Sequence, residues 1–212
     1  MIDNINIIEK YFELTDLQHK QFEALRPLYE EWNAKINVIS RKDIDSLYTK
    51  HILHSLAIAR VCTFGTGAKI MDVGCGGGFP CIPLAILFPE AHFTAVDSIG
   101  KKIRVVQAVA DAIELKNLTA INARAESIDE RFDYVVSRAV TDMNTFSKWV
   151  WNKFIANPPQ AKGTLPAGIL YLKGGDLSEE LRQFRSRTTL YEIAEMFKDE
   201  FFETKKVVYI SR

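Results

Sequence analysis

The sequence predicts an α/β fold in which a helical extension precedes a mostly parallel sheet. Short apolar runs typical of buried strands recur between residues 69 and 173, and helix-like segments separate them. A glycine-rich turn joins the first of these runs to an apolar helix, whereas residues 1–66 have apolar side chains near helical spacing. Because alternating strands and helices form parallel sheets with right-handed crossovers, we expect an extension over residues 1–66 and a core domain over residues 67–212.

Composition and charge restrict the partners and the location of the protein. The 212 residues suit one α/β domain with an extension, and the net charge of zero gives no global field to attract nucleic acid, so any RNA contact must come from local basic clusters. The three cysteines lack C-x-x-C spacing, which indicates a reducing compartment and no zinc site. With no signal-peptide pattern and no apolar run of about 18 residues, we expect a cytoplasmic protein without membrane or metal partners.

Two helices are predicted in the extension. The first spans about residues 16–33, where Pro27 is expected to break or kink it. The second spans about residues 44–61 and carries His51 and His54 three positions apart on one helix face. No carboxylate or cysteine nearby completes a metal site with them. We expect one histidine to cap a helix or line a cleft and the other to be solvated.

The stretch over residues 69–80 predicts a ligand site. Its apolar start, Ile70–Val73, is typical of a buried strand, and glycines follow at positions 74, 76, 77 and 78. The next apolar run is predicted to be a helix with Pro80 and Pro83 in its first turn. A glycine turn between a strand and a helix brings bare backbone close to a ligand and points free N–H groups at it.

The residues after Gly74 exclude two phosphate-binding motifs. The glycine at the sixth position of the dinucleotide fingerprint G-x-G-x-x-G is replaced by Phe79 or Cys81, depending on the starting glycine, and no P-loop Gly-Lys-Ser/Thr follows. What remains is acid-x-G-x-G-x-G from Asp72, which resembles motif I of the class I S-adenosylmethionine-dependent methyltransferases. In that family the glycines make room for the methionine part of the cofactor. A plain strand–helix turn without a ligand is the alternative.

A second candidate site residue, Asp97, ends the next predicted strand, which begins at His92. It follows the glycine turn by about 20 residues, the spacing at which a strand-end carboxylate accepts hydrogen bonds from both ribose hydroxyls. The alternative makes Asp97 the N-cap of the helix that follows.

Basic residues come next along the chain. Lys101, Lys102 and Arg104 lie in or near the first turn of a helix over residues 98–114, where cations oppose the helix dipole. They indicate either an anionic partner or a solvated basic face. Arg138 follows a strand over residues 132–137, at the edge where ligands of parallel sheets bind, and the alternative for it is a structural ion pair.

The remaining segments complete the predicted sheet. Strands are expected over residues 118–122, 169–173, 190–196 and 206–210, and residues 157–168 have loop composition.

Several longer motifs point to a narrower family. The most specific are Phe79-Pro80 after the glycines and Asp97-Ser-x-Gly-Lys-Lys after the second strand. Further matching pieces are Trp32-Asn33-x-Lys35-Ile36-Asn37, His51-Ile-Leu-x-Ser55-Leu56, Arg124-Ala-Glu126, Ser137-Arg-Ala139 and Leu172-Lys-Gly174. From about residue 25 onward the chain resembles the RsmG (GidB) family of 16S ribosomal RNA guanine-N7 methyltransferases.

The resemblance implies a class I methyltransferase fold: a Rossmann-like, seven-stranded, mostly parallel sheet whose last strand is antiparallel. It implies S-adenosyl-L-methionine as cofactor and 16S ribosomal RNA or the small ribosomal subunit as partner, and we expect a monomer. Phe79 is expected at the methionine side, Ala125 and Glu126 at the adenine, and Arg138 near the substrate. The full set of expected cofactor-binding residues is Gly74, Gly76, Gly78, Phe79, Asp97, Ala125, Glu126 and Arg138. The candidates for substrate contact are Lys101, Lys102, Arg104, Arg138 and Lys173.

Two departures from the family pattern stand out: His54, where many members carry aspartate, and Cys81, where many carry glycine. The expected chemistry is direct transfer of the methyl group to N7, whose free lone pair needs no general base, so no catalytic residue is named. Two alternatives remain at this point. They are a methyltransferase acting on another acceptor, and a non-catalytic cofactor-binding module in ribosome assembly.

Overall fold

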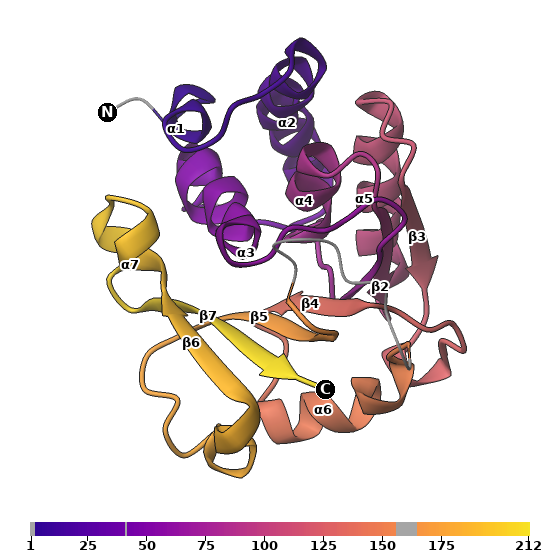
Figure 1. Ribbon diagram of the computed structural model, residues 1–212. Coiled ribbons are helices and arrows are strands. Elements are labelled where there is room, and N and C mark those ends of the chain that lie inside the picture. Colours follow the sequence, from indigo (N-terminus) through magenta and orange to yellow (C-terminus); the bar gives the residue numbers. More distant parts are fainter. Residues whose placement is uncertain (1–2, 41, 156–164) are drawn as a thin grey trace.

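The computed structural model describes residues 3–40, 42–155 and 165–212. Its centre is a seven-stranded sheet with the strand order β3-β2-β1-β4-β5-β7-β6 (Figure 1). The strands are β1 (Lys69–Val73), β2 (His92–Asp97), β3 (Leu118–Asn122), β4 (Tyr134–Arg138), β5 (Gly168–Gly174), β6 (Thr188–Glu192) and β7 (Lys205–Ser211). β7 lies between β5 and β6 and runs in the direction opposite to the other six strands. The predicted class I methyltransferase fold is thereby confirmed.

The alternation of side chains along the strands places apolar groups on both faces of the sheet. Ile70 and Phe93 belong to the cluster under the N-terminal helices, α4 (Cys81–Leu87) and α5 (Gly100–Ala112). Met71 and Val135 belong to a second cluster, which is closed by α6 (Met143–Val150) on the opposite face (Figure 1). The helix α6 had no counterpart in the sequence prediction.

The N-terminal residues form α1 (Asn6–Glu9) and α2 (Asp16–Lys35). Pro27 does not break α2, which contradicts one half of the prediction. A proline lacks the N–H that would pair with the carbonyl four residues earlier. Here the hydroxyl of Tyr48 donates to the carbonyls of Phe22 (3.0 Å) and Glu23 (3.3 Å), so the carbonyl that Pro27 leaves free is satisfied.

The second predicted helix is present as three consecutive stretches. They are a 3₁₀ turn, η1 (Ile44–Ser46), a π-helical stretch, η2 (Tyr48–Leu53), and α3 (His54–Val61). Side chains of α2 and α3 belong to the same apolar cluster as those of α4 and the sheet. The extension therefore packs directly on the face of the sheet that it covers.

The C-terminal strands differ slightly from the prediction. The strand expected over residues 190–196 is shifted, because β6 ends at Glu192 and α7 (Ile193–Met196) follows it. Ile193 is fully buried in the cluster on the helical face, which the turn of α7 makes possible. The remaining short 3₁₀ turns are η3 (Ala125–Ser127), η4 (Trp151–Lys153), η5 (Arg182–Arg187) and η6 (Glu200–Phe202). The predicted loop lies outside the described residues except for positions 165–168.

Candidate functional site

A cavity of about 410 Å³ lies at the carboxyl ends of β1, β2 and β4. This edge is where ligands of open α/β sheets bind. Seven of the eight residues predicted to bind the cofactor line it: Gly74, Gly76, Phe79, Asp97, Ala125, Glu126 and Arg138. The eighth, Gly78, is not among the lining residues. Residues from four separate turns thus share one cavity.

The glycine turn has two kinds of glycine. Gly76 has a φ of +57° and open space where a side chain would project, so it leaves its part of the cavity free. Gly78 has a φ of +104°, and a Cβ there would lie 2.4 Å from the Cδ1 atom of Ile82 and 3.1 Å from the hydroxyl of Tyr29. Only glycine tolerates both the backbone conformation and this contact. Gly78 therefore shapes the turn, and Gly76 leaves room for a ligand.

Tyr29 connects the N-terminal extension to the glycine turn. It is fully buried on α2, and its hydroxyl donates to the carbonyl of Gly77 at 2.7 Å. Its ring packs on Phe79, with the ring centroids 4.8 Å apart. The sequence contains no indication that Tyr29 contacts the glycine turn, because nothing local in α2 distinguishes this tyrosine from other core residues.

Asp97 is held in place by backbone N–H groups on both sides. One carboxylate oxygen accepts from the N–H of Gly76 (3.0 Å) and the other from the N–H of Ile99 (2.8 Å). The alternative role as N-cap of α5 is wrong, because Ile99 occupies the cap position. Each carboxylate oxygen has a further lone pair, so Asp97 can still accept hydrogen bonds from a ligand.

A second carboxylate, Asp72, lies beneath the glycine turn. It is fully buried; one oxygen accepts from the N–H of Cys81 at 3.0 Å, and the other has no partner in the described structure. Burial raises the pKa of Asp72 to about 7. The first acid of the motif therefore belongs to the scaffold of the turn.

Arg138 ends β4 at the rim of the cavity. Its guanidinium donates to the carbonyl of Lys50 (3.3 Å) and to Nδ1 of His51 (2.9 Å), and it lies 5.2 Å from the centre of the Phe79 ring. Among the described residues no carboxylate lies within 4.0 Å of it, so the structural ion pair considered for Arg138 is not found. Burial lowers its pKa to about 10, which leaves it charged at neutral pH.

The bond to Arg138 fixes the state of His51. A guanidinium only donates, so Nδ1 of His51 accepts and its ring proton is on Nε2. Burial and the charge of Arg138 lower the pKa of His51 to about 3. His51 is half-buried with its Nε2 atom shielded from solvent, and His54 is buried with its ring against Phe201 and Phe202, so the expectation that one histidine is solvated is wrong. The π-helical stretch and α3 turn both rings inward. Among the described residues no group of three potential metal ligands is found.

Comparison with known proteins identifies the family. The family model described as rRNA small subunit methyltransferase G (GidB) matches residues 18–208. The chain belongs to this family. A protein of Flavobacterium johnsoniae named ribosomal RNA small subunit methyltransferase G is 61% identical over 204 residues, covering 96% of each chain. One of the same name from Bacteroides thetaiotaomicron is 55% identical over 206 residues, covering 97% of this chain and 98% of its own.

Solved structures share the fold at low identity. The structure of MtNAS in complex with MTA and tNA has a TM-score of 0.61 at 11% identity, covering 92% of this chain and 74% of that chain. The T. thermophilus 16S rRNA N2 methyltransferase RsmC, in complex with AdoMet and guanosine, has a TM-score of 0.53 at 16% identity, covering 76% and 42%. These neighbours support the class I methyltransferase fold that the motifs predicted.

The five candidates for substrate contact lie in different places. Lys102 lines the first cavity, with its Nζ atom 4.0 Å from a carboxylate oxygen of Asp97. Lys101 and Arg104 are exposed on α5 and do not line this cavity. Lys173 lines a second cavity of about 470 Å³, and Arg138 lines both. The structure therefore brings Lys173 and Arg138 together and leaves Lys101 and Arg104 apart from them.

The described residues contain no helix with the length and apolar character needed to cross a bilayer.

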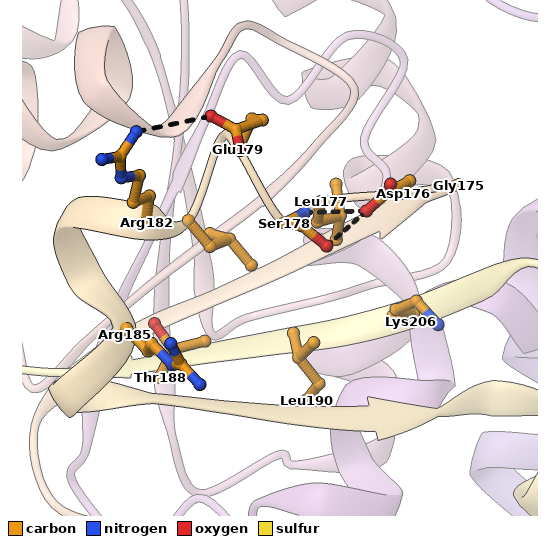
Figure 2. Close-up of a pocket in the computed structure, with 11 residues that line it drawn as sticks. Gly175, Asp176, Leu177, Ser178, Glu179, Arg182, Arg185, Thr188, Leu190 and Lys206 are labelled. Carbon is orange, nitrogen blue, oxygen red and sulfur yellow. Dashed lines mark hydrogen bonds and ion pairs between the residues drawn. The ribbon is translucent and has the colours of Figure 1, made fainter.

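A third cavity, about 810 Å³, is a cleft between residues 175–185 and the strands β6 and β7 (Figure 2). It shares no lining residue with the first cavity.

Proposed function

We propose that this protein transfers a methyl group from S-adenosyl-L-methionine to N7 of a guanine in 16S ribosomal RNA. The observation that carries the proposal is the first cavity. In a chain of this family, it combines a glycine turn, a backbone-anchored Asp97 and a charged Arg138 at its rim.

The residues fit this cofactor. The open space at Gly76 suits close approach of a ligand, and the free lone pairs of Asp97 suit the two ribose hydroxyls. Ala125 and Glu126 open the turn η3 at the other end of the cavity, where we assign the adenine. Phe79 and Arg138 are assigned to the methionine end, since a carboxylate ligand would give the guanidinium the anionic partner it lacks.

The mechanism needs alignment rather than proton transfer. The sulfonium of the cofactor supplies an activated methyl group. Guanine N7 has a free lone pair at neutral pH and therefore needs no base. The nearby titratable groups agree with this: the His51 ring is neutral with Nδ1 occupied by Arg138, and Asp72 is buried below the turn. We therefore name no catalytic residue. Positioning alone can lower such a barrier by roughly 7–11 kcal/mol at best.

The experiment that tests this proposal uses labelled S-adenosylmethionine and small-subunit ribosomal RNA from cells that lack the protein, both naked and in subunits. We expect label in 7-methylguanosine, and no label with the cofactor-site variant Asp97→Ala. Label in a different nucleoside would assign another acceptor. Cofactor binding without label in RNA would favour the binding-only alternative.

Three further features are part of the proposal. We place the division between the extension and the core domain at residues 66 and 67, the protein in the cytoplasm, and its active form as a monomer without a metal. Size-exclusion chromatography with light scattering, with and without a chelator, tests the last of these features.

A further inference from the structure

The second cavity adjoins the cofactor cavity. Arg138 and Ala139 line both, so a group bound in one lies next to the contents of the other. Ala139 has a φ of +52°, a left-handed conformation that residues other than glycine rarely adopt, and such strain is found preferentially at functional sites. The walls come from segments far apart in the sequence: η2 and α3, the end of β5, and the segment from η6 to β7.

The second cavity has an excess of positive charge. Four cations line it, and two of them are neutralised: Lys50 pairs with Asp43 (2.6 Å) and Lys173 with Glu180 (2.7 Å). Arg138 has no carboxylate partner among the described residues, and the same is true of Lys205. Burial lowers the pKa of both lining histidines, His51 and His54, so both are neutral, and two positive charges face the cavity without a counter-ion.

An aromatic ring lies beside the unpaired Lys205. Phe201 lines the cavity and is partly exposed, and the Nζ atom of Lys205 lies 5.3 Å from its ring centre. Gly174 leaves room for the Lys205 side chain, since a Cβ there would lie 3.3 Å from Nζ. An aromatic surface for a base next to a cation for a phosphate is the combination by which proteins hold unpaired nucleotides.

We propose that the second cavity receives the target guanosine flipped out of the RNA, with its base stacked on Phe201 and a neighbouring phosphate bound by Lys205. This inference rests on the proposed function, because it places the acceptor of that reaction. Enzymes that act on a base take it out of the stack, and a base here would be separated from the cofactor cavity only by Arg138 and Ala139.

The cleft in Figure 2 is the competing location, and its chemistry is less suitable. Two of its three cations are already paired, Arg182 with Glu179 (3.8 Å) and Lys206 with Glu192, and Arg185 has no carboxylate partner among the described residues. No aromatic ring lines the cleft, so a base would have no surface on which to stack. Lys205 and Lys206 are neighbours on β7, yet Lys205 lines the second cavity and Lys206 the cleft. This pair provides a matched control.

The test compares Lys205→Gln and Phe201→Leu with Lys206→Gln and Phe201→Tyr, using small-subunit RNA as acceptor. Phe201→Leu should lower kcat/KM by about 10- to 100-fold, and Phe201→Tyr should retain most of the activity because it keeps the ring. Lys205→Gln should lower kcat/KM about 5- to 10-fold and reduce the slope of log affinity against log salt by about 0.7–0.9, the value for one lost phosphate contact. Cofactor affinity should be unchanged in all four variants, and Lys206→Gln should behave as wild type.

Equal behaviour of Lys205→Gln and Lys206→Gln in an active enzyme would overturn the inference and leave the proposed function intact. If the wild type transfers no methyl group to RNA, photolabelling with 8-azidoguanosine monophosphate still decides the location. Label in the peptide that carries Phe201 and Lys205, displaced by guanosine monophosphate, supports the second cavity. Label confined to residues 182–190, which line the cleft and not the second cavity, overturns it.

Discussion

The two adjoining cavities differ in the part of the chain that lines them: mainly backbone in the first and mainly side chains in the second. The first cavity, where we place the cofactor, is shaped mainly by backbone: Gly76 leaves open space, and both oxygens of Asp97 are held by backbone N–H groups. The second cavity is shaped by long side chains such as His51, Lys173 and Lys205, which come from distant segments. A small cofactor presents the same shape at each turnover and suits a preorganised site. An RNA strand must enter and leave, which suits adjustable cations and an aromatic surface.

The largest expected effect is in the glycine turn that supports the first cavity. Gly78→Ala should lower the free energy of unfolding by about 2–5 kcal/mol, because a left-handed conformation and a 2.4 Å contact with Ile82 act together. Gly67→Ala is the control, since Gly67 also has a positive φ but nothing within 4 Å of the added Cβ. Urea denaturation measures both. Equal losses in the two variants would show that packing around the glycine turn is unimportant.

Asp72, which lies beneath the glycine turn, should make the stability of the fold depend on pH. Burial raises its pKa to about 7, against about 3.9 in an unfolded chain, so the folded state holds the proton more tightly between these pH values. This contribution therefore makes stability fall as pH rises from about 4 to about 7, by up to about 4 kcal/mol. Asp72→Asn should remove the decline, so its stability relative to wild type should improve with pH over this range. Parallel stability curves for the two proteins would contradict this.

Asp97→Ala should weaken binding of the cofactor, the ligand that we assign to the first cavity. It removes a charged acceptor, so the affinity for S-adenosylmethionine measured by calorimetry should fall by about 1–3 kcal/mol. Lys205→Gln, on the RNA side, should bind the cofactor as wild type does. An unchanged cofactor affinity in Asp97→Ala would remove Asp97 from the site.

The smallest expected effect is at Ala139, which forms the junction between the two cavities. Ala139 and Glu114 have nearly the same positive φ, 52° and 54°. Changing either to glycine relieves strain but costs chain entropy, so both variants should stay within about 1 kcal/mol of the wild-type stability. Methyl transfer should fall only in Ala139→Gly, because only Ala139 lies between the cavities. A similar loss of transfer in Glu114→Gly would contradict a special role for the junction.

The sequence was sufficient to predict seven of the residues that line the first cavity, because each of them belongs to a short motif at the end of a strand. The glycine turn, Asp97 and Arg138 each end a strand, and the carboxyl ends of parallel strands necessarily meet at one edge. Tyr29 was missed because its partner, Gly77, lies 48 positions away and no local pattern records that contact. The second cavity was missed apart from Lys173 and Arg138. Its walls join η2 to the C-terminal segment, and only tertiary packing brings these together.

The sequence was misleading where burial overrode local propensity. Pro27 predicted a break, but the Tyr48 hydroxyl compensates for the missing hydrogen bond. The strand expected to reach Met196 stops at Glu192, because a helical turn buries Ile193. In both cases a contact from outside the segment decided its structure.

The most direct test of the account is a crystal structure of the protein with S-adenosylhomocysteine and guanosine monophosphate. The account predicts the adenosyl group between Asp97 and Ala125–Glu126, and the guanine on Phe201 with N7 directed past Ala139 toward the sulfur. A guanine bound in the cleft of Figure 2, or an adenosyl group outside the glycine-turn cavity, would contradict it.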